Sequence, residues 1–341
     1  MASLPTTDQN AERKRHHFVS VTYLESWAAA SGKLHAYRSE NPTEPLHVLP
    51  KNTGFEKYYY SQLREDGSRD NDSFENVFGN VETQWPTVLE AVDAGTLDPN
   101  SLHGLFAMLT MMRTRVPAAR DYNEALMALE TRTGIKVLAE MGKLPDKLKR
   151  YQDELDTVEV TVNRPRTLGT MSEDMRRFAD MTRRLGFEIL SDDTGTDFIT
   201  SDNPVAYFDP DDRGIRQPYI ENTKVELYFP LSPRYVLRGA NRLKRFGPTP
   251  RFRKISDKKK IHAINRITSR FAYRLAFAGD RSNDDLIQRH AATSPVLDAD
   301  VVRKPGKIEY YIGHKFAARP VLPKFRPEAC EDDLCQEDFR S

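Results

Sequence analysis

The chain carries the segment Asp197-Phe198-Ile199-Thr200-Ser201-Asp202-Asn203-Pro204-Val205. Its apolar first half predicts a strand, and the polar residues that follow predict a turn. Two interpretations of this turn are open. In one, Asp202 and Asn203 cap their own backbone while Pro204 fixes the direction of the chain. In the other, Asp202 is a metal ligand or a general base at the end of a strand, with Asn203 as a hydrogen-bonding neighbour.

The sequence around this segment predicts an antiparallel meander. Short β-favouring runs at 187–190, 225–230 and 235–239 flank it. Further strands are expected at 33–38, 46–49 and 56–62, and a last long helix at 257–278. Between these groups, residues 72–155 follow helical periodicity. This order predicts an α+β fold, an antiparallel sheet with an inserted helical layer at about 72–185.

Length and composition set the expected class of protein. The 341 residues are 38% hydrophobic and 10% aromatic, which is enough for a sizeable core. We expect a single α+β domain over 15–319, a disordered segment at 1–14 and an acidic polar tail at 320–341. A net charge of +1 excludes attraction of nucleic acid or membrane by overall charge. Apolar runs fall short of the ~20 residues that span a bilayer, so a cytoplasmic protein without membrane contact is predicted.

One arginine stands out in the helical block. On a helix projection, Arg113 falls within the apolar stripe formed by Leu102, Phe106, Leu109 and Val116, whereas Arg115 points the other way. A buried guanidinium needs a partner, because leaving it unpaired costs several kcal/mol. Arg113 is therefore either a structural residue, paired with a carboxylate or snorkelling to solvent, or an anion-binding or site-organising residue that faces a pocket. Earlier in the block, Pro86 is expected to kink its helix.

Two further positions are candidates for chemistry. Glu82 lies beside the expected kink and could hold a divalent ion, although an exposed acidic face is the simpler interpretation. His16 precedes a second histidine and could move protons, although a solvated pair is the simpler interpretation. We find no glycine-rich phosphate loop, dinucleotide fingerprint or zincin motif.

The stretch 242–260 is locally basic. It contains nine Lys and Arg residues against one acid, and Arg251, Arg253, Lys258 and Lys259 are its candidate nucleic-acid contacts. Only Phe246 and Phe252 interleave with the charges, so support for base stacking is thin. A solvated basic loop balanced by the acidic tail is the alternative.

Two motifs resemble those of the domain-of-unknown-function 4238 family, whose members are mostly bacterial. The first is His16-His17-Phe18-Val19-x3-Tyr23-Leu24-x2-Trp27, and the second is Phe198 to Val205. Ser20 and Trp27 depart from the family pattern, which has proline and phenylalanine there. The resemblance covers roughly 15–280 and implies that His16, Glu82, Arg113, Asp202 and Asn203 converge. It implies no activity, because the family has no agreed one.

Two functional hypotheses follow. In the first, the protein is a metal-assisted hydrolase of phosphoesters or nucleic acid. Asp202 and Glu82 would hold a divalent metal, His16 would move protons and Arg113 would stabilise the developing anion. In the second, it is a non-catalytic regulatory module that binds nucleic acid or protein through 242–260.

Overall fold

The structure is a computed structural model of the chain. It describes residues 15–63, 69–70, 73–155, 160, 162, 164–210, 224–304 and 307–318. The expected disordered segment 1–14 and acidic tail 320–341 lie outside these residues. In the described part, no helix is long and apolar enough to cross a membrane.

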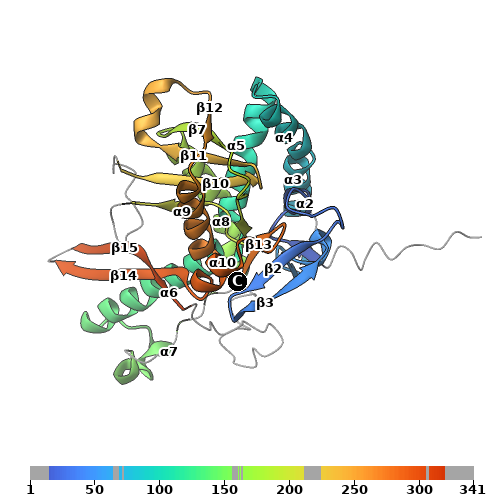
Figure 1. Ribbon diagram of the computed structural model, residues 1–341. Coiled ribbons are helices and arrows are strands. Elements are labelled where there is room, and N and C mark those ends of the chain that lie inside the picture. The colour runs from blue at the N-terminus through green and yellow to red at the C-terminus, as the bar shows by residue number, and fades with distance from the viewer. Residues whose placement is uncertain are drawn as a thin grey trace, which may run out of the picture.

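Within the described ranges, strands form two main sheets and three two-stranded ribbons (Figure 1). The five-stranded sheet has the order β12-β7-β11-β10-β9, and the four-stranded sheet has the order β3-β2-β13-β8. Every pair is antiparallel except β12 with β7. The strands are β1 Arg15–His17, β2 Leu34–Arg38, β3 Asn41–Val48, β4 Phe55–Lys57, β5 Gln62–Leu63, β6 Arg69–Asp70, β7 Gly186–Asp192, β8 Thr200–Ser201, β9 Ala206–Phe208, β10 Glu226–Ser232, β11 Tyr235–Ala240, β12 Arg251–Ile255, β13 Leu275–Ala278, β14 Ser294–Lys304 and β15 Lys307–Ala317.

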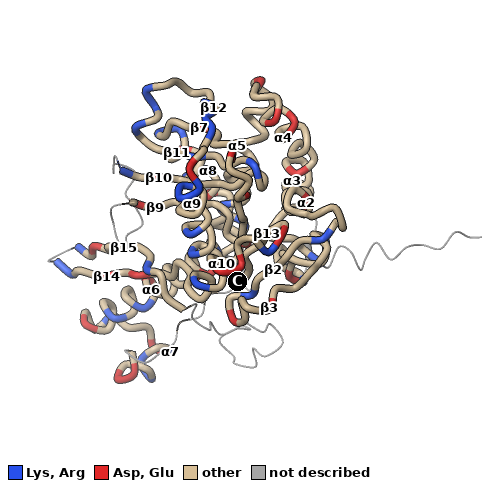
Figure 2. The backbone as a smooth tube through the Cα atoms, in the orientation of Figure 1, with Lys and Arg blue, Asp and Glu red and all other residues tan. Residues whose placement is uncertain are grey.

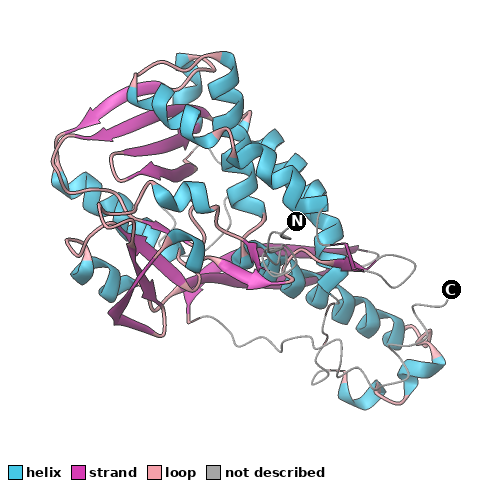
Figure 3. Ribbon diagram, turned by 90° about the vertical axis from the view of Figure 1, so that its right-hand side faces the viewer, coloured by secondary structure: helices cyan, strands magenta, loops and turns pink. Residues whose placement is uncertain are grey.

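Helices between β6 and β7 form the layer that the sequence predicts. The helices that the structure describes are α2 Val21–Glu25, α3 Ser73–Glu82, α4 Trp85–Asp93, α5 Pro99–Thr114, α6 Pro117–Glu140, α7 Asp146–Lys149, α8 Arg164–Thr182, α9 Lys258–Phe271 and α10 Asp284–His290, with 3-10 turns η1 Pro50–Asn52, η2 Gln152–Glu154 and η3 Asn241–Phe246. The fold is mixed α+β with several antiparallel sheets, as predicted. Figure 3 shows the strands in separate groups with helices packed beside them.

The five-stranded sheet lies between two sets of helices. One face carries Phe187, Ile189 and Leu237, which belong to the same core as the helical layer, and Phe106 of α5 meets Phe187 with ring centroids 4.8 Å apart. The other face packs on Ile261 of α9. Because side chains alternate across a strand, the part of this second face that α9 leaves uncovered is available to polar residues.

Several expected elements differ in the structure. Pro86 separates α3 from α4 instead of kinking one helix, because it occupies the first turn of α4, where its missing N–H costs nothing. The strand expected at 56–62 is broken by a turn, with Tyr58 at φ 56°. The segment 197–208 is not one meander strand, since β8 joins the four-stranded sheet and β9 the other. The last helix ends at Phe271 rather than 278.

Candidate functional site

The two sequence motifs meet in the core. The hydroxyl of Tyr23 donates to the carbonyl of Pro230 at 2.7 Å and lies 2.6 Å from the Thr200 hydroxyl, and Trp27 Nε1 donates to the Phe198 carbonyl at 3.2 Å. All of these side chains are buried. Buried polar groups must be paired, so these contacts fix how the first motif docks on the second. Their positions explain why the two motifs occur together.

His16 is part of a buried network. Its Nδ1 accepts the backbone N–H of Tyr60 at 2.8 Å, and its ring stacks on the Tyr60 ring with centroids 5.7 Å apart. Only 1% of the residue is exposed. A ring nitrogen that accepts a hydrogen bond is unprotonated and occupied, so Nδ1 does not act as a base on a substrate.

The buried arginine that the helix projection assigned to position 113 is instead Arg115. Its Nη1 pairs with Glu82 Oε1 at 2.7 Å, its Nε donates to the Phe18 carbonyl at 3.1 Å, and its guanidinium lies 5.1 Å from the centroid of the Phe78 ring. Only 1% of Arg115 is exposed. Burial lowers the pKa of Arg115, but the charge of Glu82 reverses this effect and raises it. Glu82 is thus engaged by a cation of the protein itself.

Arg113 is half-buried and has a different role. Its Nη1 donates to the carbonyl of Val205, the last residue of the second motif, at 3.3 Å. Within the part of the chain that the structure describes, no carboxylate pairs with it. Burial lowers the pKa of Arg113, while nearby Tyr122 and Tyr207 act in the opposite direction. The helix projection failed because α5 contacts α3, α4, α6 and α8, so it has no single buried face.

Asp202 ties the end of α9 to the four-stranded sheet. Its carboxylate is fully buried and accepts the backbone N–H groups of Tyr273 at 2.7 Å and of Arg274 at 2.8 Å, while its own N–H donates to the Leu275 carbonyl at 2.9 Å. Burial raises the pKa of Asp202 to about 6 against the pull of these hydrogen bonds. The carboxylate therefore holds the turn from α9 into β13, closer to the capping interpretation than to that of a solvent-facing ligand.

Two asparagines make further hydrogen bonds between α9 and the segment around Asp202. Asn203 Nδ2 donates to the carbonyl of Phe271, the last residue of α9, at 2.9 Å. Asn265 of α9 accepts the N–H of Ile199 at 3.2 Å and donates to the carbonyl of Asp197 at 2.9 Å. Asn203 thus satisfies one terminal carbonyl of α9 from outside the helix, and Asp202 binds the N–H groups that follow the C-cap residue.

The five predicted site residues therefore fall into different buried networks. Tyr60 bridges His16 to Arg115 and thus to Glu82, through its N–H to His16 and its hydroxyl to the Arg115 carbonyl at 3.2 Å. Asp202 instead has its partners at the α9–β13 turn. Across the described ranges, no group of three or more His, Cys, Asp and Glu side chains is placed to hold a metal ion.

A concave polar site lies elsewhere, at the β12 edge of the five-stranded sheet. We call this cavity of about 370 Å³ the arginine pocket, and its lining consists of Glu188, Arg238, Arg242, Leu243, Arg245, Phe246, Arg251, Phe252 and Arg253. Figure 2 shows Lys and Arg gathered around β12 and the loop that leads into it. The pocket takes in two of the four predicted nucleic-acid contacts, Arg251 and Arg253. Lys258 and Lys259 are exposed in the first turn of α9, outside its lining.

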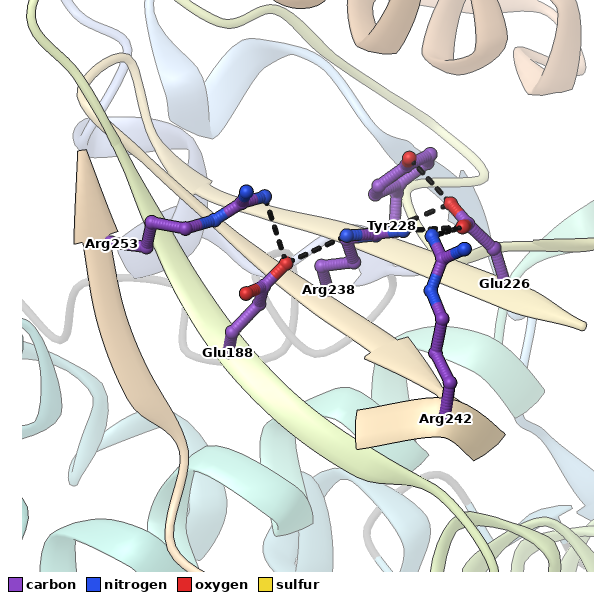
Figure 4. Close-up of polar contacts among 6 residues, drawn as sticks. All are labelled: Glu188, Glu226, Tyr228, Arg238, Arg242 and Arg253. Atoms are coloured by element: carbon purple, nitrogen blue, oxygen red, sulfur yellow. Dashed lines mark hydrogen bonds and ion pairs between the residues drawn. The ribbon is translucent and has the colours of Figure 1, made fainter. Parts of the chain in front are cut away.

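An alternating chain of charges forms one side of the arginine pocket (Figure 4). Arg238 is central: it pairs with Glu188 at 2.7 Å and also with Glu226. Glu188 also binds Arg253 at 3.0 Å, and Glu226 also binds Arg242 at 2.6 Å. Each carboxylate is thus shared by two arginines. Arg242 and Arg253 stay 64% and 49% exposed, so both remain accessible to a ligand.

Phe246 forms the other side of the arginine pocket. The guanidinium carbons of Arg251 and Arg245 lie 4.1 Å and 4.7 Å from the centroid of its ring. Among the described residues, neither arginine pairs with a carboxylate. A guanidinium that stacks by its face keeps its N–H donors at its edge, where they can meet an oxyanion. Phe246 is 43% exposed, and both arginines beside it are exposed as well.

A family model described as "Protein of unknown function (DUF4238)" matches residues 15–282, which include both motifs. The chain belongs to the DUF4238 family. No curated protein and no solved structure matches it significantly. In this DUF4238 protein, the family segment also contains the whole arginine pocket.

Sequence reasoning missed four members of these sites. Arg115 was placed on the wrong side of its helix, and Glu188, Glu226 and Arg238 were not considered. The available signal was alternation, because Glu188 and Arg238 are charged residues within otherwise apolar strands. Their pairing in register across β7 and β11 depends on which strands are neighbours, which alternation does not show.

Proposed function

We propose that this protein binds nucleic acid through the arginine pocket and has no chemistry of its own at the motif residues. The observation that carries the proposal is the charge balance of the pocket. Five arginines and one glutamate line it, and among the described residues Glu226 is the one further carboxylate that pairs with these arginines. The remaining positive charge suits a phosphate.

The donor geometry supports phosphate over a simple counter-ion. Arg251 and Arg245 present planar N–H edges that no described carboxylate occupies, and planar forks bind phosphate oxygens in pairs. Phe246 and Phe252 are 43% and 38% exposed beside these arginines. Half-exposed rings next to arginines favour a ligand that has flat bases as well as phosphates, which is nucleic acid.

The contacts that Glu82 and Asp202 already make within the protein support a binding role. The carboxylates of Glu82 and Asp202 are the two proposed metal ligands. Glu82 pairs with Arg115, and Asp202 accepts two backbone N–H groups. Recruiting either for a metal would leave buried donors unpaired at a cost of about 1–3 kcal/mol each. Metal-assisted hydrolysis stays a prediction, and the binding module is the function that this arrangement favours.

The proposal is tested by binding of labelled oligonucleotides to Arg251→Gln and Arg245→Gln at several salt concentrations. Loss of a charge-assisted contact of about 1.5–3 kcal/mol should weaken binding by about 10-fold to 100-fold. The salt dependence should also fall by about one phosphate contact. Arg150→Gln is the matched control, because Arg150 is exposed and stacks on Tyr151 at 4.7 Å but lies outside the pocket.

Equal affinity in the wild type and both pocket variants would refute the proposal. The arginines of β12 would then serve only to keep an edge strand from pairing with another chain.

A further inference from the structure

We infer that the arginine pocket takes one unpaired nucleotide, with its phosphate on Arg245 and Arg251 and its base on Phe252, so that the protein prefers single strands to duplexes. The inference rests on the proposed function and names the form of nucleic acid that the same site selects.

The size of the site favours a single nucleotide. A cavity of about 370 Å³ is near the lower end of the ~300–1,000 Å³ range of small-molecule sites. A duplex offers its phosphates on a convex surface and keeps its bases stacked inside, whereas a flexible single strand can place one nucleotide in a concavity. A concave arginine site therefore suits a strand whose bases are free.

Phe252 supplies the surface for the base. It is a large apolar side chain on the edge strand β12, is 38% exposed and lines the pocket. Among the described residues, neither another aromatic ring nor a cation packs on its ring, in contrast to Phe246, which carries two guanidiniums. An uncovered ring beside phosphate-binding arginines is the arrangement by which proteins stack bases without reading sequence.

The alternation of side chains along β12 puts the phosphate-binding Arg251 and the base-binding Phe252 on different sides of the strand. Successive residues of a strand point to opposite faces, so Phe252 lies across the edge from Arg251 and Arg253. All three line one pocket, which therefore reaches round the strand edge. A nucleotide seated there has its phosphate on the arginine side and its base on the ring side.

The test compares a labelled single-stranded DNA, the duplex of the same sequence and a strand of equal length whose sugars lack bases. Wild-type protein should bind the single strand at least about tenfold more tightly than the duplex. Phe252→Ala should weaken binding to the single strand by about 5-fold to 100-fold, as expected for one lost stacking contact. It should leave binding to the base-free strand unchanged. Phe252→Tyr should behave as wild type because it keeps the ring.

Tyr311→Ala is the matched control, since Tyr311 is an aromatic residue that is 43% exposed on β15, outside the pocket. Equal binding of duplex and single strand, or an unchanged affinity in Phe252→Ala, would overturn the inference while leaving the proposed function standing if Arg251→Gln still weakens binding. Absence of binding to all three probes would overturn both.

Discussion

Because Arg115, and not Arg113, forms the buried ion pair with Glu82, the two arginines should differ in how much they contribute to the free energy of unfolding. Arg115→Met removes a guanidinium that is 1% exposed and leaves Glu82, whose side chain is 23% exposed, without its cation. Breaking a buried ion pair from one side costs about 3–5 kcal/mol. The Phe18 carbonyl loses its donor as well, but the partial exposure of Glu82 lets water replace some of the lost interaction. We expect a loss of about 3–4 kcal/mol in the free energy of unfolding.

Arg113→Met is the matched control two residues earlier in the same helix. Arg113 makes one hydrogen bond to a backbone carbonyl at 3.3 Å and pairs with no described carboxylate, and burial already lowers its pKa. Its replacement by an apolar chain of similar length should change the free energy of unfolding by about 1 kcal/mol or less. Glu82→Gln, alone and combined with Arg115→Met, completes a double-mutant cycle.

The assay is urea unfolding followed by circular dichroism, with the midpoint and slope fitted for each variant. The cycle should give a coupling energy of about 2 kcal/mol or more between Arg115 and Glu82. A cost for Arg113→Met that equals or exceeds that of Arg115→Met would refute the assignment of the buried pair. A coupling energy near zero would show that Arg115 acts through packing on Phe78 and not through Glu82.

Two further predictions concern Asp202 and the close packing of Gly186 against Leu243 of η3. Because the pKa of Asp202 is raised to about 6 in the folded state, the folded state binds more protons than the unfolded state between about pH 4 and pH 6. Stability should therefore fall by up to about 3 kcal/mol as pH rises through this window, and Asp202→Asn should flatten the slope in unfolding experiments at each pH. Gly186→Ala should destabilise by more than about 3 kcal/mol and disturb the arginine pocket, because the added Cβ would lie 2.0 Å from the backbone carbon of Leu243. Gly134→Ala, in an open position of α6, should instead stabilise the fold by about 0.5–1 kcal/mol. The measurement is the melting temperature of each variant, and equal melting temperatures for Gly186→Ala and Gly134→Ala would contradict both expectations.

The sequence predicted most of the secondary structure because periodicity is a local property. Within the helical block of 72–155, Phe78, Trp85, Val88 and Val92 recur at helical spacing and are buried, whereas Val77 is 56% exposed. The helical block and its position between strand groups also followed from period and order. The arginines of 242–260 were recognised as a cluster because they are close in sequence.

The remaining features depend on contacts between residues that are far apart in the sequence. Asp202 holds the turn after α9 by binding N–H groups 71 and 72 residues along the chain, so this turn had no local signal. The carboxylates that organise the arginine pocket come from β7 and β10, and only the order of strands places Glu188 beside β12 and Glu226 beside Arg238 of β11. The side of α5 on which an arginine is buried depends on four neighbouring helices. Local pattern thus determined which elements form, and the tertiary structure decided which charges meet, because Coulombic and hydrogen-bonding partners are chosen by distance in space and not by distance along the chain.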